Sequence, residues 1–375
     1  MQGRNILYIG EYAGFAGGIE RYAYQTALLL RGNGCRVSWY GDKPARDEAV
    51  FKAAFNGIVD MSNVLAGDTG YDLVLMHKIP PYEMLVALSE EYGDRLVFCA
   101  HDHDLYCPRH HYYTPFGRTN CHRAYSPLRC SACALVSNPR RWKSLLIRQA
   151  DIMARLRKHR IIVLSSFMMD NLHRNGFARV QIVHPVIDLQ EAAPREDTGE
   201  LKVLFLGQLL RGKGADLMLE ALALLKAPWK ATVAGDGKDM EMLKELAASL
   251  GIADKVEFTG WLVHPEERLS ECDVLVFPSR WQEPFGLSGA EALAAGVPVV
   301  AFDVGGVREW LEDGVCGFVV PEKDIVAMAS KLEYLYENKA VAAEMGAAGR
   351  RRIMEGFSSA RFLASVQELV QGVSK

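Results

Sequence analysis

The sequence predicts an α/β protein made of two domains, each with a parallel sheet covered by helices on both faces. Short apolar segments of strand length alternate with segments of helix length along most of the 375 residues. This alternation is typical of doubly wound parallel sheets. It is interrupted once, by the polar segment LQEAAPREDTGELK after Asp188, and then resumes. A chain of this length can also form two separate cores.

The predicted elements of the first half are buried strands separated by helical segments. The strand candidates are NILYIGEY, RVSWYG, DLVLM, RLVFCAHD, RIIVLSS and VQIVHPVID. The spacing of apolar residues predicts helices over residues 21–31 and 81–91. Because the strands are apolar throughout, we expect them to be covered on both faces. The polar segment after Asp188 is the predicted linker.

The second half repeats this order. Its strand candidates are KVLFLG, KATVAG, KVEFTG, CDVLVFP and VPVVAF. Helices are predicted over residues 215–225, 240–250 and 288–295, and an amphipathic helix over 358–373 ends the chain. Four of these five strands end in Gly or Pro, where the ligand-facing loops of an open α/β sheet begin.

Composition and charge argue against several classes of protein. Apolar residues make up 49% and charged residues 24%, as in an ordinary folded protein. The net charge of −3 gives no reason to expect a nucleic-acid partner. No N-terminal segment has the pattern of a signal peptide. Nowhere do about eighteen apolar residues run together, as a membrane-spanning helix requires. We therefore expect a cytoplasmic protein.

Two glutamates in the second half form the clearest chemical pattern. Glu283 lies in the loop after the strand CDVLVFP, and Glu291 lies in the helix that follows. Phe285, Gly286 and Leu287 form the turn between strand and helix. The first amides of a helix attract anions, so a diphosphate could bind there. The carboxylates could accept hydrogen bonds from sugar hydroxyls and from a ribose. Alternatively, both glutamates are solvated surface residues.

The complete stretch PSRWQEPFGLSGAEALAAGVPVV closely resembles glycosyltransferase family 4, a large family of retaining enzymes. The resemblance implies the GT-B fold, in which two Rossmann-like domains face a central cleft. It implies that residues 1–190 bind the acceptor and residues 191–357 bind a nucleoside diphosphate sugar of UDP or GDP type. The C-terminal helix, 358–375, is expected to cross back to the first domain.

A second match to this family lies in FLGQLLRGKGADLMLEAL. The family usually has Gly-Arg-Leu, three residues, and then Lys-Gly, and its arginine and lysine hold the donor diphosphate. Lys213 fits the pattern, but Gln208 stands where the arginine is expected. Arg211 could supply the missing charge, because a guanidinium binds phosphate better than a neutral amide does. The alternative is an ordinary surface lysine before a helix, which is common in proteins in general.

Several glycine pairs and one histidine also match the family in order and spacing. Gly235 and Gly237 resemble its nucleotide-side loop, Gly305 and Gly306 a pair near the donor, and Gly17 and Gly18 its first loop. A dinucleotide fingerprint fails, because Gly14, Gly17 and Gly18 lack the G-x-G-x-x-G spacing. His101 ends a strand where the family's histidine touches the donor sugar and the acceptor. A hydrogen-bonded structural histidine is the alternative.

The eight cysteines fall into two groups. Four scattered ones are expected to be buried thiols: Cys35, Cys99, Cys272 and Cys316. The other four crowd into the segment 101–137: Cys107, Cys121, Cys130 and Cys133. Their C-x-x-C spacing suits a structural zinc ion or an iron–sulfur cluster, which could order a segment with few helix or strand signals. Three histidines could replace a thiolate: His110, His111 and His122. Otherwise the four thiols are reduced and unligated.

Two further features bear on metals and membranes. Asp102 and Asp104 form an Asp-x-Asp pair, but the surrounding pattern is not that of metal-dependent glycosyltransferases, so we expect no cofactor for catalysis. Residues 138–160 are rich in Lys and Arg and have an apolar stripe at helical spacing. Such a helix can lie on an anionic membrane surface, or its stripe can pack against its own domain.

The resemblance implies transfer of a sugar, with retention at the anomeric carbon, to a hydroxyl of a glycan or lipid-linked glycan. Synthesis of envelope polysaccharide, lipopolysaccharide or glycolipid is the expected setting, at the inner face of the cytoplasmic membrane. The implied catalytic residues are His101, Glu283, Lys213 and Arg211. Two alternatives stay open. They are a nucleotide-sugar epimerase or hydrolase of the same fold, and a non-catalytic, metal-binding scaffold derived from a transferase.

Overall fold

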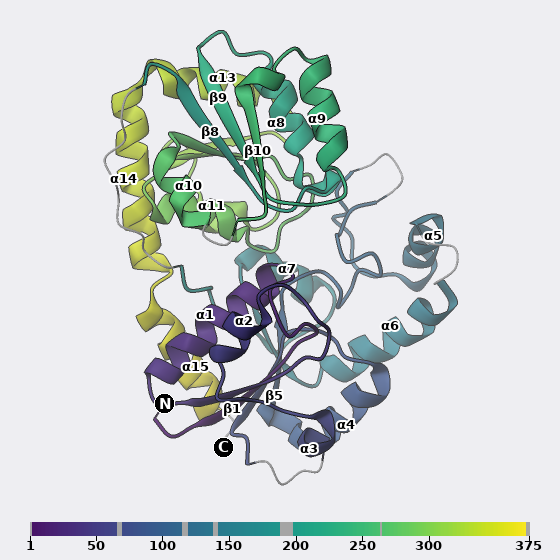
Figure 1. The fold of residues 1–375 in the computed structure, drawn as a ribbon. Coiled ribbons are helices and arrows are strands. Elements are labelled where there is room, and N and C mark those ends of the chain that lie inside the picture. Colours follow the sequence, from purple (N-terminus) through teal and green to yellow (C-terminus); the bar gives the residue numbers. More distant parts are fainter. Residues whose placement is uncertain are drawn as a thin grey trace. The chain divides into compact units, whose positions relative to one another are not determined.

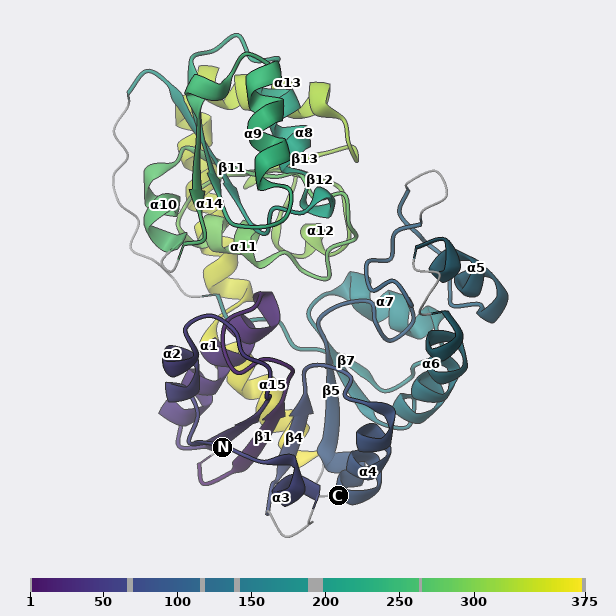
Figure 2. The same ribbon diagram turned by 45° about the vertical axis from the view of Figure 1, so that its right-hand side comes forward.

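The computed structural model describes residues 2–65, 70–114, 119–137, 142–187, 198–262 and 265–372, without the side chains of residues 63, 137, 142–148, 265 and 266. The chain divides into two compact units. Unit 1 comprises Met1–Val186 and Ser359–Lys375, and unit 2 comprises Ile187–Ser358. Each unit is an α/β domain with helices on both faces of a sheet (Figures 1 and 2). Residues 189–197, most of the predicted linker, lie outside the described residues.

Unit 1 contains a parallel sheet with the strand order β3-β2-β1-β4-β5-β6-β7. Its strands are β1 (Asn5–Ile9), β2 (Arg36–Tyr40), β3 (Gly57–Ile58), β4 (Leu73–Met76), β5 (Leu96–Ala100), β6 (Arg160–Val163) and β7 (Val180–Ile182). The central strands β4 and β5 are buried along their whole length, because helices cover both faces. The order reverses between β1 and β4, and such switch points carry the ligand sites of open α/β sheets.

The helices of unit 1 come from both ends of the chain. They are α1 (Gly18–Gly32), α2 (Glu48–Ala53), α3 (Met61–Leu65), α4 (Tyr82–Tyr92), α5 (Pro127–Ser137), α6 (Trp142–Leu156), α7 (Ser166–Arg174) and α15 (Ser359–Gln371), with a 3-10 turn at Gly93–Arg95. The C-terminal helix α15 lies beside α1 in both views (Figures 1 and 2). Its Leu369 carbonyl accepts a hydrogen bond from Arg160 Nη1 at 2.7 Å.

Unit 2 contains a parallel sheet in the order β10-β9-β8-β11-β12-β13. Its strands are β8 (Leu201–Leu206), β9 (Trp229–Ala234), β10 (Val256–Gly260), β11 (Val274–Phe277), β12 (Val299–Phe302) and β13 (Gly317–Val320). Its helices are α8 (Ala215–Leu222), α9 (Met240–Ser249), α10 (Pro265–Glu271), α11 (Leu287–Ala294), α12 (Val307–Trp310), α13 (Ile325–Glu337) and α14 (Lys339–Gly356), with 3-10 turns at Arg211–Lys213 and Ala253–Lys255. Here the strand order reverses between β8 and β11.

The structure contains several elements that the sequence did not predict. The segment 101–137 has few helix or strand signals, but α5 forms its last part. Pro127 explains this start, because proline suits the first helical position, where no N–H bond is needed. No element was predicted between residues 303 and 357, where α12, β13, α13 and α14 occur, and the helices α2, α3, α7 and α10 were not predicted either. No helix in the described part of the chain is both long and apolar enough to cross a bilayer.

Candidate functional site

The candidate donor residues of unit 2 follow the carboxyl ends of its strands. Lys213 lies in the loop after β8, and Glu283 lies in the loop after β11. These two strands are neighbours at the point where the strand order reverses. Loops at such a point diverge to opposite faces of the sheet and leave room for a ligand between them. The topology therefore explains why two residues 70 positions apart meet.

Lys213 and Glu283 form an ion pair. Lys213 Nζ lies 2.8 Å from Glu283 Oε1 and 3.0 Å from Oε2. The same Oε1 accepts a hydrogen bond from Ser279 Oγ at 2.6 Å. The Glu283 side chain is only 8% exposed, whereas that of Lys213 is 27% exposed. The ammonium group is thus the more accessible part of a carboxylate–ammonium pair that is already held in place.

The loop that carries Lys213 packs tightly against the loop that carries Glu283. Arg280 binds Asp216 through two hydrogen bonds of 2.6 and 2.7 Å, and its amide donates to the Gly212 carbonyl at 2.8 Å. Gly214 has φ +76, and a Cβ there would lie 1.9 Å from the Pro278 carbonyl oxygen. Only glycine fits such a contact at this φ. The close contact between Gly214 and Pro278 therefore fixes the position of the Lys213 backbone relative to the loop after β11.

The remaining predicted donor residues on this loop are accessible. Arg211 opens the 3-10 turn Arg211–Lys213 and is exposed, and its carbonyl accepts a hydrogen bond from Arg280 Nη1 at 2.7 Å. Gln208 is exposed as well. A guanidinium in this position could bind a phosphate group, and it lies in the same turn as Lys213.

The first turn of α11 follows Glu283. Phe285 is 1% exposed, and its carbonyl accepts a hydrogen bond from Trp310 Nε1 at 2.7 Å. Its side chain therefore belongs to the core, and only its backbone could meet a ligand. Gly286 precedes the first helical residue, Leu287, with φ +94. Glu291 is half-buried on the same helix.

Two glycine pairs join the neighbouring loops of unit 2. A Cβ on Gly305 would lie 2.1 Å from the Glu283 carbonyl oxygen, which also accepts the Gly306 amide at 2.7 Å. Gly235 and Gly237, after β9, come equally close to the loop after β8. Sequence reasoning missed three polar residues of this region: Ser279, Arg280 and Gln282. Their signal was their position within the stretch PSRWQEPFG, at the end of a buried strand.

His101 follows β5 in unit 1 and meets a second histidine. His77 follows β4, the neighbouring strand, and its Nδ1 lies 2.8 Å from His101 Nε2. Tyr22 of α1 packs edge-on against His101, with ring centroids 4.8 Å apart. Burial lowers the pKa of His101 to about 4, aided by the Lys78 ammonium and opposed by Asp102. Both rings are therefore neutral at pH 7, because burial also holds the pKa of His77 well below its usual range.

The Asp-x-Asp pair is occupied by a lysine from the same unit. Lys78 Nζ lies 2.7 Å from Asp102 Oδ2 and 3.0 Å from Asp104 Oδ2. Burial acts to lower the pKa of Lys78, but the two carboxylates outweigh it and raise the pKa. Burial and the neighbouring Asp102 raise the pKa of Asp104 well above its usual range. The structure thus provides an internal cation where a metal-dependent enzyme would bind an external one.

The loop after β1 carries the glycine pair of unit 1. Gly17 precedes α1, and Gly18 is its first residue. Glu20 is 5% exposed, and burial raises the pKa of its carboxyl group, partly offset by hydrogen bonds from the backbone of residues 20 and 17. Glu20 therefore caps the start of its own helix, and the exposed Gly18 leaves backbone accessible beside it.

The clustered cysteines are free thiols in this structure, and all four are half-buried. Cys130 and Cys133 lie one turn apart on α5, and the Ser126 amide donates to Cys130 Sγ at 3.4 Å. Cys107 and Cys121 pack against the core of unit 1. Among the described residues, three potential metal ligands lie within 4.8 Å of one another in two groups, His77–Cys99–His101 and Asp102–Asp104–His110. The four cysteines form no such group. The other four, Cys35, Cys99, Cys272 and Cys316, are buried thiols, as predicted.

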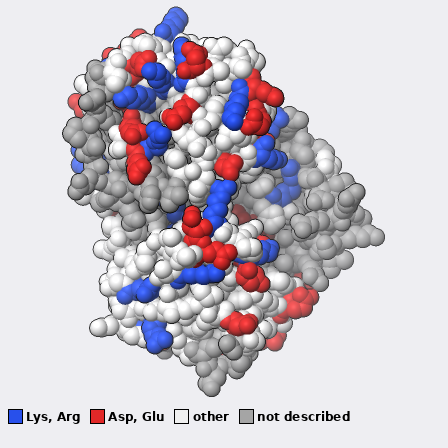
Figure 3. Space-filling model, viewed as in Figure 1, with Lys and Arg blue, Asp and Glu red and all other residues white. Residues whose placement is uncertain are grey.

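The basic segment 138–160 is described only in part. Residues 138–141 and the side chains of residues 142–148 lie outside the described part. From Gln149 onward the apolar stripe packs inward, because Met153 and Leu156 are buried in the core of unit 1. On the face drawn in Figure 3, acidic and basic side chains are interspersed over the described residues.

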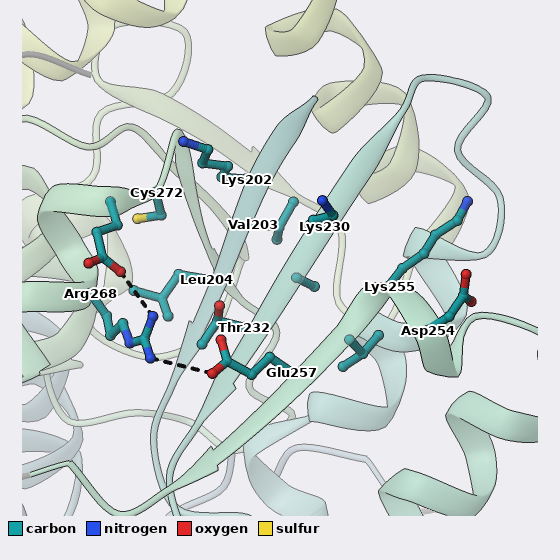
Figure 4. A pocket seen from close by; sticks show the side chains of 13 residues that line it. Lys202, Val203, Leu204, Lys230, Thr232, Asp254, Lys255, Glu257, Arg268 and Cys272 are labelled. Atoms are coloured by element: carbon teal, nitrogen blue, oxygen red, sulfur yellow. Dashed lines mark hydrogen bonds and ion pairs between the residues drawn. The ribbon is translucent and has the colours of Figure 1, made fainter. Parts of the chain in front are cut away.

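A cavity of about 430 Å³ lies elsewhere in unit 2, over β8, β9 and β10 (Figure 4). Lys202, Lys230 and Lys255 line it, together with Arg268, whose Nη2 lies 3.4 Å from Glu257 Oε1. Lys202 and Lys230 stand near the amino ends of their strands. Ligands of open α/β sheets bind at the carboxyl ends, so this cavity is separate from the candidate donor site.

Comparison with known proteins assigns this arrangement to a family. The family model described as "Glycosyl transferases group 1" matches residues 186–352. Glycogen synthase of Mycobacterium tuberculosis is 30% identical over 226 residues, which are 57% of this chain and 52% of that protein. The lipopolysaccharide core biosynthesis mannosyltransferase LpsB of Rhizobium meliloti is 31% identical over 242 residues, 60% of this chain and 68% of that protein. The chain spans about half the length of the first of these relatives.

A solved structure extends the similarity to both units. The Anabaena protein HepE in complex with UDP and glucose has a TM-score of 0.74 and 18% sequence identity, covering 98% of this chain and 100% of that one. At this identity the similarity is one of fold. Together with the two parallel sheets, it confirms the predicted architecture of two Rossmann-like domains, the GT-B fold.

Proposed function

The chain belongs to the glycosyl transferases group 1 family, and we propose on this premise that it is a retaining glycosyltransferase of family 4. The proposed reaction moves a sugar from a nucleoside diphosphate sugar, of UDP or GDP type, to a hydroxyl of a glycan or lipid-linked glycan. Catalysis needs no metal or other cofactor in this proposal. Synthesis of an envelope polysaccharide, lipopolysaccharide or glycolipid is the setting that these relatives favour.

The observation that carries the proposal is the ion pair between Lys213 and Glu283 at the switch point of the unit 2 sheet. A leaving diphosphate develops negative charge, and fixed positive charge and amide groups stabilise it most effectively. Lys213, Arg211 and the amides at the start of α11 fill this role. Glu283 binds hydroxyls of the donor sugar and supports positive charge near its ring.

The other predicted residues complete the donor site. Glu291 binds the ribose, and Gly235 and Gly237 let the nucleoside approach the backbone. Gln208 replaces an arginine of the family pattern, so Arg211 provides the second positive charge. In unit 1, Gly17 and Gly18 offer backbone to the substrates, and His101 contacts the transferred sugar. No separate nucleophile is assigned, so a front-side displacement is the simplest route to retention.

Sugar transfer and its two alternatives differ in how they consume the donor. The whole chain is first screened against UDP and GDP sugars for thermal stabilisation, because ligands of the folded state raise its Tm. The stabilising sugar is then incubated with and without candidate glycan acceptors. A transferase consumes donor only when acceptor is present, and it yields a product with retained configuration by NMR. An epimerase or hydrolase consumes donor without acceptor, and a non-catalytic scaffold consumes none.

Two variants connect this activity to the site. Glu283→Gln keeps the size of the side chain and removes its charge, and we expect it to lower kcat about 100- to 1,000-fold. Glu257→Gln is the matched control, because Glu257 lies on β10 beside the separate cavity. Unchanged turnover in the Glu283→Gln variant contradicts the proposed site.

We also propose that Cys107, Cys121, Cys130 and Cys133 hold one structural metal ion or an iron–sulfur cluster. Three features support this. Cys130 and Cys133 lie one helical turn apart on α5, and the Ser126 amide donates a hydrogen bond to Cys130 Sγ. Cys107 and Cys121 both pack against the core of unit 1. The burial that raises the pKa of Cys107 to about 11 is partly offset by the backbone amides of residues 109 and 112. The metal would order the acceptor-side loop and take no part in the reaction.

A lipid-linked acceptor would bring the protein to a membrane surface. Leu128 and Val136 on α5 are 86% and 60% exposed, and the basic segment 138–160 follows them directly. Apolar side chains beside basic residues favour contact with an anionic bilayer. Co-sedimentation with vesicles that contain phosphatidylglycerol tests this, with phosphatidylcholine vesicles as the control. Equal binding to both, or to neither, contradicts an electrostatic membrane contact.

A further inference from the structure

His77 is a buried titratable residue that the proposed chemistry leaves without a role. It is 1% exposed and lies among the rings of Tyr8 and Tyr22, with centroids 4.6 and 5.8 Å away. Its Nδ1 is 2.8 Å from His101 Nε2. Its Nε2 has no hydrogen-bond partner within the described part of the chain. A buried polar ring with one partner and one unpaired atom requires an explanation.

One proton must lie between the two rings. Burial keeps the pKa of both histidines below neutral pH, so each ring carries a single proton at pH 7. A neutral imidazole has one N–H donor and one acceptor nitrogen. At 2.8 Å, one of the facing nitrogens donates and the other accepts. Only the direction of that bond remains to be decided.

The unpaired Nε2 of His77 decides the direction. If His77 carried its proton on Nε2, a buried N–H would have no acceptor, at a cost of about 1–3 kcal/mol. An unpaired acceptor is tolerated more readily than an unpaired donor. The Trp39 ring packs 6.3 Å from the His77 ring, and its Nε1–H is also unpaired. Because the Trp39 Nε1–H group is a donor close to His77, it also favours an Nε2 atom of His77 that is unprotonated and can accept.

We propose that His77 is a positioning residue that donates its Nδ1–H to His101 and thereby fixes the tautomer of His101. In this tautomer, His101 accepts at Nε2 and carries its own proton on Nδ1. His101 then meets the substrates as a hydrogen-bond donor through Nδ1, suited to an oxygen of a sugar hydroxyl or phosphate. It has no free lone pair for general-base catalysis. The role of the His101 Nδ1–H group toward the substrates rests on the proposed function, whereas the assignment of the tautomer does not.

A bound metal is the competing account of this cluster, because Cys99 also lies within 4.8 Å of both rings. Two nitrogens bound to one tetrahedral zinc ion, at about 2.0–2.1 Å each, lie about 3.3 Å apart. The 2.8 Å separation is shorter and matches a hydrogen bond.

NMR of the whole chain, labelled with ¹⁵N-histidine, reads the tautomer without any turnover. Long-range ¹H–¹⁵N spectra distinguish protonated from unprotonated ring nitrogens, and spectra of His77→Phe and His101→Phe variants assign the two rings. We expect protons on His77 Nδ1 and on His101 Nδ1. A proton on His101 Nε2 overturns the proposal. So does a spectrum of the purified chain that changes when a chelator is added, because it indicates a bound metal.

Activity then tests the consequence. His77→Phe should lower kcat of sugar transfer about 10- to 100-fold with a smaller change in the donor KM, and it should shift His101 toward a mixture of tautomers. His77→Asn, whose amide can donate near the position of Nδ1, should recover most of the rate. In a His101→Ala background, His77→Phe should cause no further loss. An equal loss in both backgrounds, or a wild-type tautomer in His77→Phe, contradicts the positioning role. If the chain transfers no sugar, the NMR result still decides the tautomer.

Discussion

Lys213 Nζ contacts both carboxylate oxygens of Glu283, at 2.8 and 3.0 Å, although the two residues belong to different strand-to-helix loops. The sequence assigns them to different parts of a donor, the diphosphate and the sugar. Their pairing means that a bound diphosphate would share the ammonium group with Glu283. The ammonium group is therefore already paired before a donor binds, and Ser279 Oγ donates a further hydrogen bond to the same carboxylate.

Variants of this pair should separate stability from activity. Lys213→Met leaves the carboxylate of Glu283 buried without its cation, so we expect the free energy of unfolding to fall by about 1–3 kcal/mol. Glu283→Gln combined with Lys213→Met should restore most of that loss, because no buried charge remains. Turnover should stay low in the double variant. Chemical denaturation and the transfer assay measure the two effects, and restored turnover in the double variant contradicts the assigned roles.

The contact between the loops after β8 and β11 should depend on Gly214. Gly214→Ala combines a left-handed backbone, φ +76, with a Cβ 1.9 Å from the Pro278 carbonyl oxygen. We expect it to destabilise unit 2 and to weaken donor binding by displacing Lys213. Gly251→Ala is the matched control, because Gly251 has φ +69 and nothing within 4 Å of the added atom. In the control, the free energy of unfolding should fall only by the backbone strain of an alanine at positive φ, about 1–2 kcal/mol.

Melting curves and donor titrations compare the two alanine variants. A similar fall in Tm for both variants, with unchanged donor affinity, would show that the contact with Pro278 is unimportant. A larger fall for Gly214→Ala, together with weaker donor binding, supports the assigned contact.

Much of this fold could be predicted from the sequence because parallel strands are apolar on both faces and end in glycine-rich loops. The strands β8, β9 and β11 were found in this way. The helix α5 was missed, since cysteines and alanines with one proline resemble a loop when a metal site is also considered. The ion pair could not be predicted, because a contact 70 residues apart leaves no local pattern. It follows from the strand order β9-β8-β11, which the sequence does not state.

The histidine pair illustrates the same limit in unit 1. Both histidines directly follow apolar strands, DLVLM and RLVFCA, so the signal for His77 was as strong as that for His101. Only His101 was predicted to belong to the site, because only its position matches the histidine of family 4. Adjacent pairing of β4 with β5 makes the two rings neighbours. Strand adjacency is a tertiary property, and periodicity in one chain does not reveal it.

The same histidines should make unit 1 sensitive to acid. A histidine whose pKa is lowered by folding takes up a proton in the unfolded state before it does so in the folded one. Stability is then full above the unfolded pKa of about 6.5 and decreases as the pH falls toward the folded value. For His101 this window ends at about pH 4. At pH 5 we expect the protonation of His101 to lower the free energy of unfolding by on the order of 1–2 kcal/mol, and His77 to act in the same direction.

Denaturation at pH 7 and pH 5 measures this effect. In a His77→Asn and His101→Asn double variant, the loss between the two pH values should shrink, because two groups no longer titrate. Asp104, whose pKa is raised by burial and by Asp102, acts in the opposite direction but is present in both proteins, so it cancels. An unchanged pH dependence contradicts the buried, neutral state of the pair.

The four clustered cysteines, on α5 and in the loop before it, should bind a metal. Protein purified without oxygen should contain about one zinc ion per chain, or iron and sulfide with visible absorbance, by elemental analysis and spectroscopy. Cys130→Ser with Cys133→Ser should remove the metal and expose the loop to proteolysis. Cys272→Ser, a buried thiol in unit 2, is the control and should keep it. The metal site is contradicted if the wild-type protein contains no metal and resists protease no better than the double variant does. The four residues are then ordinary thiols. Donor-induced thermal stabilisation should persist in the double variant, because the donor residues lie in unit 2 and the cysteines in unit 1.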